Sequence, residues 1–133
     1  METATHKTRQ TKYCLQIEEI VKQLGHASNA QILVALHKTY PNVSATTVHR
    51  ATTRLAARGE LGIAPVDTSG AMRYDANTQP HDHFVCLHCG LLRDVDIADK
   101  VTPLLTSAIE GCSMSGRITV SGTCKECKRG DSI

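Results

Sequence analysis

Aromatic residues are scarce in this sequence. Its 133 residues include no tryptophan, one phenylalanine and three tyrosines, so aromatics make up only 3% of the chain. Any core must therefore be built from leucine, isoleucine, valine and alanine. The length suits one medium domain or two small ones. Small cores of this kind are marginal without a bound metal or a partner chain, so we expect one or both.

The sequence also lacks a long apolar run and a signal peptide. Residues 1–10 are polar, and no segment approaches the roughly 20 apolar residues that span a bilayer. We therefore expect a cytoplasmic protein with no membrane partner. The formal net charge of +2 and the pI near 8.3 are too mild to indicate nucleic-acid binding by themselves. The positions of arginine and lysine have to decide that question.

Cysteine, in contrast, occurs six times, and four of the six form two Cys-x-x-Cys pairs. In a chain without a signal peptide, this spacing indicates metal binding more often than disulfides. Two such pairs supply the four thiolates of a closed, structural Zn²⁺ site. Cys14 and Cys112 stand alone, and we expect buried or half-buried thiols at both. The predicted zinc ligands are Cys86, Cys89, Cys124 and Cys127.

A redox dithiol is the alternative interpretation of a Cys-x-x-Cys pair. Such pairs usually open a helix after a strand. Here Gly90 follows the first pair and a strand-like run begins. The sequence favours zinc, with a zinc-ribbon redox enzyme as the alternative from another functional class.

Three helices are predicted in the N-terminal half. Apolar residues recur at intervals of three and four over 11–24. Ser28 is an expected N-cap for a second helix that ends near Tyr40, and Ser44 for a third that ends near Arg58. Short helices joined by tight turns indicate a helix-turn-helix arrangement.

Two extended runs follow, at 61–66 and 71–75, and flank a turn-rich loop. A hairpin directly after a helix-turn-helix indicates a winged helix. Residues 76–81 lack periodicity and indicate a linker. Beyond it we expect strands near 84–87, 91–96 and 117–122 and a helix near 98–110.

The predicted fold class is therefore mixed α/β (α+β). A winged helix-turn-helix domain would occupy 1–75, and a small α/β unit that ends in the second cysteine pair would occupy 84–133. The segment 76–83 would link them.

The outward side of the third predicted helix is rich in threonine and arginine. Hydroxyl groups can bind phosphates, and arginine can bind guanine or phosphate. An ordinary solvated helix face has the same composition, but the position before a wing favours double-stranded DNA. One copy reads few base pairs, so a homodimer on two half-sites is expected. The predicted DNA-binding residues are Thr46, Thr47, His49, Arg50, Thr53 and Arg54.

A second metal site is predicted around His81 and His83. Alternate residues of a strand project to one face, so the two imidazoles can converge. With nearby carboxylates they suit Fe(II), Mn(II) or Zn(II), although solvated linker histidines are the alternative. His26 lies between two predicted helices, where a lone histidine is usually solvated or caps a helix. The candidate carboxylates are Asp75, Asp82, Asp94 and Asp96.

In combination, these motifs resemble the ferric uptake regulator (Fur) family. The resemblance rests on the wing Arg-Tyr-Asp75, on His81-x-His83-x-x-Cys86-x-x-Cys89-Gly90, on Asp94 and on Gly122-Thr-Cys124-x-x-Cys127, and it covers about 9–128. It implies a dimeric bacterial transcription factor, not an enzyme, with structural zinc on the four cysteines. In this family the winged-helix domain, here 1–75, binds DNA, and the C-terminal α/β domain, here 84–133, mediates dimerisation. The resemblance also implies a regulatory ion at the hinge, 76–83, which carries metal ligands. The ligands it implies for that ion are His26, Asp75, His81, His83 and Asp94.

Within the family, nitrogen and oxygen ligands with aspartate at position 94 are similar to the peroxide-sensing (PerR) branch. In that branch, bound Fe(II) reacts with hydrogen peroxide, a ligand histidine is oxidised and the repressor leaves DNA. By analogy, His26 and His81 are the residues expected to be oxidised. The alternative is an iron, manganese or zinc homeostasis repressor without peroxide sensing. His49 stands where the family usually has tyrosine, which affects the expected operator sequence.

Overall fold

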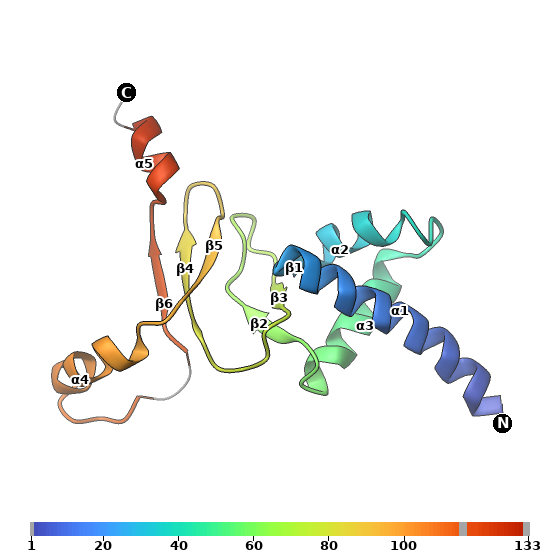
Figure 1. Ribbon diagram of the computed structural model, residues 1–133, viewed down its shortest axis with the longest axis horizontal. Helices are drawn as coiled ribbons and strands as arrows, with labels where there is room; N and C mark the ends of the chain where they lie inside the picture. The colour runs from blue at the N-terminus through green and yellow to red at the C-terminus, as the bar shows by residue number, and fades with distance from the viewer. Residues whose placement is uncertain (1, 115–116, 132–133) are drawn as a thin grey trace. The chain divides into compact units, whose positions relative to one another are not determined.

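A computed structural model describes residues 2–114 and 117–131 of the chain. The chain divides between Thr78 and Gln79 into two compact units, called here unit 1 and unit 2. In the described residues, each unit contains one three-stranded sheet together with helices (Figure 1).

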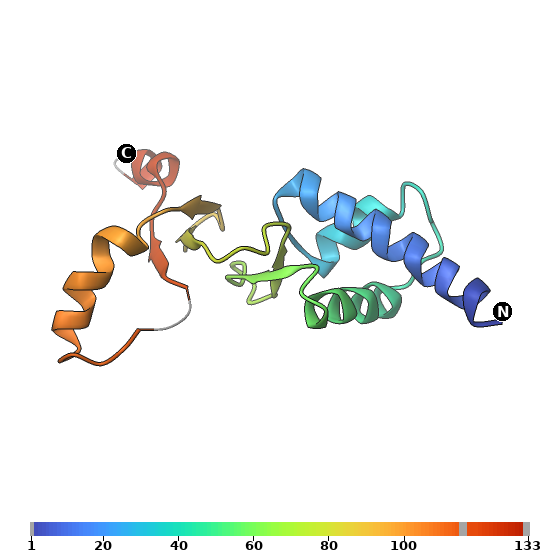
Figure 2. The same cartoon turned by 60° about the horizontal axis from the view of Figure 1, so that its bottom comes forward.

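Unit 1 consists of three helices and a small sheet. In Figures 1 and 2 the helices gather round a shared centre, with the sheet at one end of the group. The elements are α1 (Glu2–Leu24), β1 (His26–Ser28), α2 (Asn29–Leu36), α3 (Ala45–Ala57), β2 (Gly62–Ala64) and β3 (Arg73–Asp75).

Helices α2 and α3 begin after the serines that the sequence indicates. Ser28 Oγ accepts a hydrogen bond from Gln31 N at 3.3 Å, and the Gln31 side chain accepts one from Ser28 N at 3.0 Å. This reciprocal pair is a capping box, which satisfies two backbone donors at the helix start. Ser44 Oγ accepts from Thr47 N at 3.1 Å. Both predicted caps are confirmed, and α3 ends at Ala57, one residue before the predicted end.

Two other helix boundaries differ from the prediction. Helix α1 begins at Glu2 rather than near residue 11. Its first ten residues lack an apolar period, but glutamate, alanine, lysine, arginine and glutamine are good helix formers. Helix α2 ends at Leu36 rather than near Tyr40, because a tight turn follows in which Thr39 N donates to Leu36 O at 3.0 Å.

The sheet of unit 1 has the order β1-β3-β2 with antiparallel neighbours. Strand β1 is absent from the prediction, which placed His26 in a turn between helices. In the structure His26 is a strand residue opposite Asp75. A strand of three residues is too short to show alternation, and its partner follows only after two more helices.

Strands β2 and β3 form the predicted hairpin, and side-chain hydrogen bonds of Asp67 in the loop and of Arg73 in β3 hold the loop in place. Asp67 Oδ1 accepts a hydrogen bond from Ala71 N at 3.0 Å. The Arg73 guanidinium donates to Pro65 O at 2.9 Å and to Val66 O at 3.0 Å. The winged-helix prediction is confirmed, with β2 at the sheet edge as Pro65 indicates.

The core of unit 1 lies where the three helices meet the sheet. As the composition predicts, it is almost entirely aliphatic, and Tyr74 is its one aromatic member. Tyr13 and Tyr40 pack edge to face at the margin of the core, with ring centroids 5.1 Å apart. The buried cluster consists of Ile17, Ile20, Val21, Ala27, Ile32, Leu36, Val43, Val48, Ala51, Leu55, Leu61 and Tyr74.

Unit 2 is built round a mixed sheet of order β5-β4-β6. Strand β4 pairs antiparallel with β5 and parallel with β6. The elements are β4 (Asp82–Cys86), β5 (Leu92–Val95), α4 (Ala98–Ala108), β6 (Thr119–Gly122) and α5 (Lys125–Asp131).

The prediction for unit 2 is wrong at two places. Asp82 and His83, expected in the hinge segment, belong to strand β4. Helix α5 was not predicted; its seven residues include a glycine, so local propensity gives little signal.

Helix α4 packs little against the sheet of its own unit. None of its residues is buried, and Leu104 is 72% exposed, Leu105 38% and the adjoining Ile109 40%. In both ribbon views α4 stands away from the strands (Figures 1 and 2). Contiguous exposed apolar side chains usually mark a contact surface.

Within 2–114 and 117–131, every helix is too short or too polar to cross a bilayer.

Candidate metal centres and nucleic-acid interface

The four paired cysteines converge in unit 2. Cys86 ends β4 and Cys89 lies in the turn that follows, where Gly90 adopts a φ of 82°. Cys124 follows β6, and Cys127 lies in α5. The parallel β4–β6 pairing places Gly122 opposite Cys86, so the two pairs meet at one end of the sheet. Their four sulfur atoms all lie within 4.8 Å of one another.

The spacing of these sulfur atoms fits Zn²⁺. A tetrahedron with zinc–sulfur distances of about 2.3 Å has sulfur–sulfur edges of about 3.8 Å. Cys89 Sγ and Cys124 Sγ are 3.7 Å apart. All four cysteines are free thiols rather than disulfides. The group therefore suits a closed structural zinc site, as predicted.

Backbone amides make one of the sulfur atoms a good anion. Cys89 N donates to Cys86 Sγ at 3.4 Å, and Cys124 N donates to it at 3.3 Å. These bonds lower the pKa of the Cys86 thiol to about 6. The pKa of Cys127 is raised, first by its hydrogen bond with Cys124 and then by burial. A cation bound among the sulfur atoms would stabilise the other cysteines as thiolates too, and the thiolate is the form that binds metal.

The second pair resembles a redox dithiol in one respect, because Cys124 and Cys127 open a helix after a strand. A redox dithiol needs two sulfur atoms, however, whereas four converge here. The convergence favours metal. Of the two lone cysteines, Cys14 is half-buried as expected, but Cys112 is exposed. It follows the exposed end of α4, which covers no core.

In unit 1, the β1–β3 pairing brings a histidine and a carboxylate together. His26 and Asp75 are direct cross-strand partners, and His26 Nε2 lies 3.5 Å from Asp75 Oδ2. The other carboxylate oxygen, Oδ1, accepts a hydrogen bond from Asn77 N at 2.9 Å. This bond fixes the carboxylate and leaves Oδ2 toward the imidazole.

In unit 2, two histidines share one carboxylate. His83 lies opposite Asp94 in the β4–β5 pair. Asp94 Oδ1 is 3.3 Å from His81 Nε2 and 3.4 Å from His83 Nε2, and the two rings lie 4.4 Å apart. His81 Nδ1 is 2.7 Å from Gln79 O, so it donates there and leaves Nε2 as the ligating atom. Backbone hydrogen bonds of this kind typically orient metal-binding histidines.

Asp82, between the two histidines, is not part of this group. Its carboxylate accepts hydrogen bonds from Ile118 N and Ala98 N at 3.0 Å and from Ile97 N at 3.4 Å. These bonds lower the pKa of Asp82, with that from Ile118 the largest cause. Asp82 therefore ties β4 to the start of α4 and to β6, because its side chain projects to the opposite sheet face from His83. Among the described residues, Asp96 also lies outside both candidate metal groups.

Helix α3 exposes much of the face predicted to bind DNA. Thr46, His49, Arg50 and Thr53 are exposed, whereas Val48 and the other inward residues are buried. Thr47 is half-buried. Its hydroxyl lies 3.0 Å from Ser44 Oγ at the helix start.

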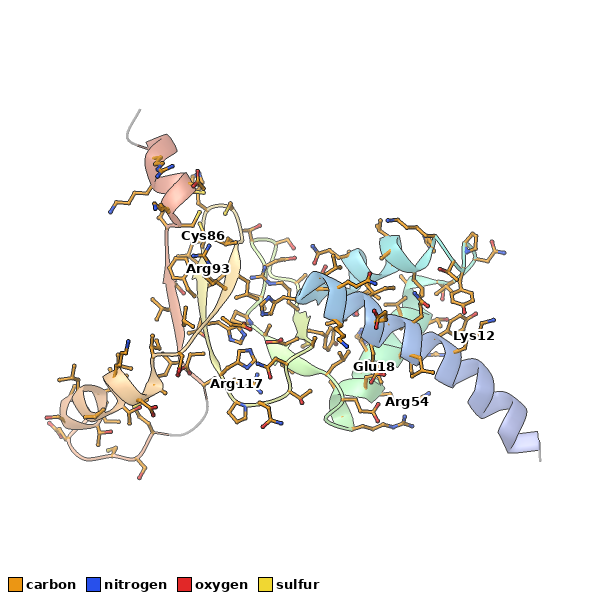
Figure 3. All side chains as sticks on the ribbon, in the orientation of Figure 1. Lys12, Glu18, Arg54, Cys86, Arg93 and Arg117 are labelled. Carbon is orange, nitrogen blue, oxygen red and sulfur yellow. The ribbon has the colours of Figure 1, made fainter. Side chains whose placement is uncertain are left out.

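Arg54 lies at the flank of this face, toward α1. It is half-buried. Burial raises the pKa of the Cys14 thiol, and the charges of Arg54 and Arg58 oppose that rise. Figure 3 labels Arg54 on α3 together with Glu18 on α1. Arg54 is therefore a flanking cation rather than a central member of the exposed face.

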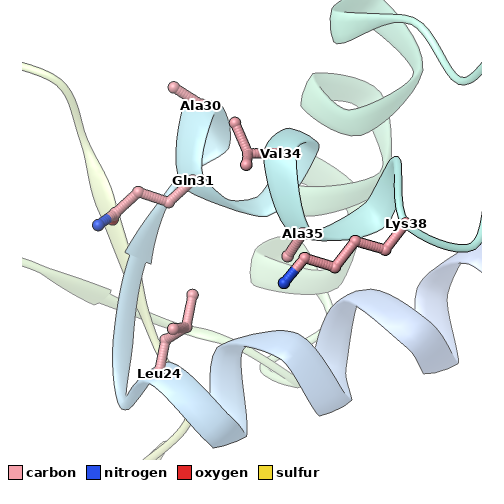
Figure 4. A pocket seen from close by; sticks show the side chains of 6 residues that line it. All are labelled: Leu24, Ala30, Gln31, Val34, Ala35 and Lys38. Atoms are coloured by element: carbon pink, nitrogen blue, oxygen red, sulfur yellow. The ribbon is translucent and has the colours of Figure 1, made fainter. Parts of the chain in front are cut away.

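A groove lies between the end of α1 and the outer side of α2 (Figure 4). Its lining is mainly aliphatic, and Lys38 is the one charged side chain. It contains no candidate metal ligand. The lining residues are Leu24, Ala30, Gln31, Val34, Ala35 and Lys38.

Known proteins share both the sequence pattern and the fold. Residues 4–109 match the model of the Ferric uptake regulator family. The peroxide-responsive repressor PerR of Staphylococcus epidermidis is 29% identical over 113 residues, covering 82% of this chain and 73% of that protein. The ferric uptake regulation protein 1 of Mycolicibacterium fortuitum is 34% identical, over 75% of this chain and 62% of that protein.

Among solved structures, the Campylobacter jejuni peroxide stress regulator superposes with a TM-score of 0.73 at 23% identity. The superposition covers 95% of this chain and 96% of that one, so the fold is shared throughout. The family match spans well over half of the chain and includes the wing, the histidine pair and the first cysteine pair. The chain belongs to the Ferric uptake regulator family.

Proposed function

We propose that this chain is a metal-dependent, DNA-binding transcriptional repressor that responds to peroxide, and not an enzyme. The observation that carries the proposal is the pair of contacts from Asp94 Oδ1 to His81 Nε2 and His83 Nε2, at 3.3 and 3.4 Å. These donors are nitrogen and oxygen only, and they are separate from the four sulfur atoms. Such a set suits Fe(II) or Mn(II), whereas the thiolates suit Zn²⁺.

The two metal sites have different roles in this proposal. Zinc on the four cysteines would hold the ends of β4 and β6 together and act structurally. The second ion would be regulatory. His81, His83 and Asp94 supply only three ligands, and His26 and Asp75 supply two more from unit 1. We assign all five to one ion, as the family resemblance implies.

The regulatory effect follows from the origin of the ligands. An ion bound by both units restricts their relative orientation, and it binds the restricted form better than the unrestricted form. That difference in affinity is the free energy available to shift the population. If the restricted form also binds DNA, operator DNA must tighten metal binding by the same factor by which metal tightens DNA binding.

The DNA-binding element would be α3, supported by the wing. Its exposed face carries Arg50 and His49 among threonines. One α3 reads few base pairs, so two copies on two half-sites are required. The exposed apolar residues of α4, with Leu104 at 72%, supply a surface that a second copy can cover.

The regulatory site is tested by His81→Ala, with His88→Ala as the matched control. His88 is an exposed histidine in the turn between the zinc ligands. We expect the His81 variant to keep zinc, fold and dimer but to lose Mn(II)-dependent operator binding. The His88 variant should behave like wild type. Metal-dependent binding that survives in His81→Ala would remove this residue from the site.

Peroxide sensing is tested on Fe(II)- and Mn(II)-loaded protein. Fe(II) held by His26, His81 and the other proposed ligands would supply the electrons for cleavage of the oxygen–oxygen bond of hydrogen peroxide. We expect a mass gain of one oxygen on His26 or His81 in the Fe(II) form, with loss of DNA binding, and none in the Mn(II) form. Mass spectrometry of tryptic peptides locates the oxygen. Oxidation confined to the cysteines, with zinc release, would make the thiolates the sensor instead.

A metal-homeostasis repressor is the second candidate. It is favoured by the 34% identity to a ferric uptake regulation protein, which exceeds the 29% identity to the PerR protein. Its signature would be metal-dependent DNA binding that survives peroxide with both histidines unmodified.

A further inference from the structure

A chain of hydrogen bonds leads from the buried side of α3 to its exposed face. Thr52 is fully buried, and its hydroxyl donates to Asn29 Oδ1 at 2.8 Å. On the other side of the same amide, Asn29 Nδ2 lies 3.4 Å from His49 Nδ1. His49 is exposed on the face proposed to bind DNA. Among the described residues, neither Asn29 nor Thr52 belongs to a candidate metal group.

The donors and acceptors in this chain have a defined direction. An amide NH₂ group can only donate, so His49 Nδ1 must accept. A neutral imidazole has one protonated nitrogen, so the proton lies on Nε2. The Thr52 hydroxyl has one proton and three acceptors within reach, of which Asn29 Oδ1 at 2.8 Å is nearer than the carbonyl oxygens of Val48 and His49, at 3.1 and 3.2 Å. Donation to Oδ1 leaves Nδ2 toward His49.

Asn29 itself has a fixed position. It is the first residue of α2 and follows Ser28, whose side chain caps that helix. Ser28 in turn pairs with Arg73 in the β1–β3 ladder. The amide is therefore attached to two ordered elements and can orient an exposed ring that would otherwise rotate.

We infer that Asn29 is a positioning residue that makes His49 present its Nε2–H group to DNA, so that His49 selects bases by their hydrogen-bond acceptors. The inference rests on the proposed DNA binding by α3. In the major groove, the acceptors are purine N7, guanine O6 and thymine O4. Adenine N6 and cytosine N4 are donors and would be rejected.

Asn29→Asp provides a sharp test because it reverses the polarity. A carboxylate only accepts, so at pH 8 the neutral ring must carry its proton on Nδ1 to bond with Asp. Nε2 then becomes an acceptor toward DNA. Binding is measured on operator variants, each changed at one base pair of a half-site selected with the wild-type protein. Ratios between operators cancel the uniform loss that the added negative charge causes.

In the wild type we expect about 2- to 13-fold discrimination at one position per half-site, the range for a single hydrogen bond. His49→Ala should abolish it at that position. Asn29→Ala should reduce it at the same position, and the double variant should match His49→Ala. Asn29→Asp should instead prefer the base pair that offers a donor. Thr52→Val, which frees the amide without changing its chemistry, should act in the direction of Asn29→Ala but more weakly.

Imidazole ¹⁵N chemical shifts of the free protein at pH 8 test the same inference without DNA. We expect protonated Nε2 in the wild type and protonated Nδ1 in Asn29→Asp. Protonated Nδ1 in the wild type, or an unchanged base preference in Asn29→Asp, would overturn the inference. If the metal-loaded wild type binds no DNA, the proposed function fails, whereas the shifts still decide whether Asn29 sets the ring.

Discussion

Units 1 and 2 are stabilised in different ways. Unit 1 has a contiguous cluster of twelve buried side chains, all apolar apart from the hydroxyl of Tyr74. Unit 2 buries Val85 as its one large aliphatic residue among those described, together with two cysteines, a histidine and an aspartate. Its buried positions are occupied mainly by side chains that bind metals or accept backbone hydrogen bonds.

The difference shows how a small unit can be ordered without a core. Apolar burial contributes roughly 25 cal/mol per Å², so the cluster in unit 1 is stabilising without assistance. Three strands of four or five residues do not supply comparable burial in unit 2. Its order must come from specific links between elements: the four sulfur atoms with their ion and the carboxylate of Asp82. In the proposed dimer, a second copy would also cover α4. Four predictions test this contrast.

Removal of a zinc ligand should have the largest effect, and only on unit 2. Structural zinc sites contribute about 10–16 kcal/mol of folding free energy. We therefore expect Cys124→Ser to unfold unit 2 and abolish dimerisation while the helices of unit 1 remain folded. Zinc content, sedimentation and far-UV circular dichroism measure the three outcomes. Cys112→Ser, at an exposed lone cysteine, is the matched control and should resemble wild type. Dimerisation and zinc content unchanged in Cys124→Ser would refute the contrast.

Truncation of a leucine should lower the free energy of unfolding in unit 1 but not in unit 2. Leu55 is fully buried in α3, so Leu55→Ala should cost about 2–5 kcal/mol of unfolding free energy. Leu104 of α4 is 72% exposed, so Leu104→Ala should leave the stability of the monomer unchanged and weaken the dimer. Urea denaturation and sedimentation equilibrium separate the two effects. Equal loss of stability in the two variants would mean that α4 belongs to a core.

Asp82 should make unit 2 less stable as the pH falls below about 4. Its pKa is lowered in the folded state, so it contributes stability above about pH 3.9, the ordinary aspartate pKa. That contribution is lost as pH falls through the lowered folded value. Asp82→Asn should weaken unit 2 at neutral pH and reduce the slope of stability against pH below 5. Thermal melts at constant zinc loading would show an unchanged slope if the carboxylate were unimportant.

The smallest expected effect is that of Glu18 in unit 1, whose pKa is shifted upward, whereas that of Asp82 is shifted downward. Burial raises the pKa of Glu18, and the neighbouring Glu60 raises it further. A raised carboxyl pKa favours the folded state below the ordinary value of about 4.3, and this stability is lost as pH rises through the folded value. Glu18→Gln should therefore stabilise unit 1 slightly at pH 7, with no gain at pH 4. A destabilised variant at pH 7 would show that the charge of Glu18 has a favourable partner.

The sequence predicts much of unit 1 because its signals are local. Ser28 and Ser44 mark helix starts through side-chain bonds that span three residues, and apolar periodicity marks the buried faces. The same locality explains why β1 is missed, since three residues show no period and the pairing of His26 with Asp75 is long-range. His26 consequently enters the candidate site only through the family resemblance.

In unit 2, cysteine spacing predicts which four thiols converge, but composition does not distinguish the aspartates. Asp82, Asp94 and Asp96 are chemically equivalent in the sequence. The β4–β5 register separates them, because it places Asp94 opposite His83. Asp82 meets three backbone amides that lie far along the chain, which no local pattern reveals.

The segment that connects the two cysteine pairs can vary in length. Cys86 and Cys124 are 38 residues apart, so folding must close a long loop before both pairs can hold one ion. By analogy with a covalent cross-link, closing a loop of this size costs conformational entropy equivalent to about 4 kcal/mol. Doubling the loop changes the closure term by only about 0.6 kcal/mol. The connection between the pairs can therefore accept insertions and deletions at little energetic cost, whereas the two-residue spacing inside each pair cannot vary.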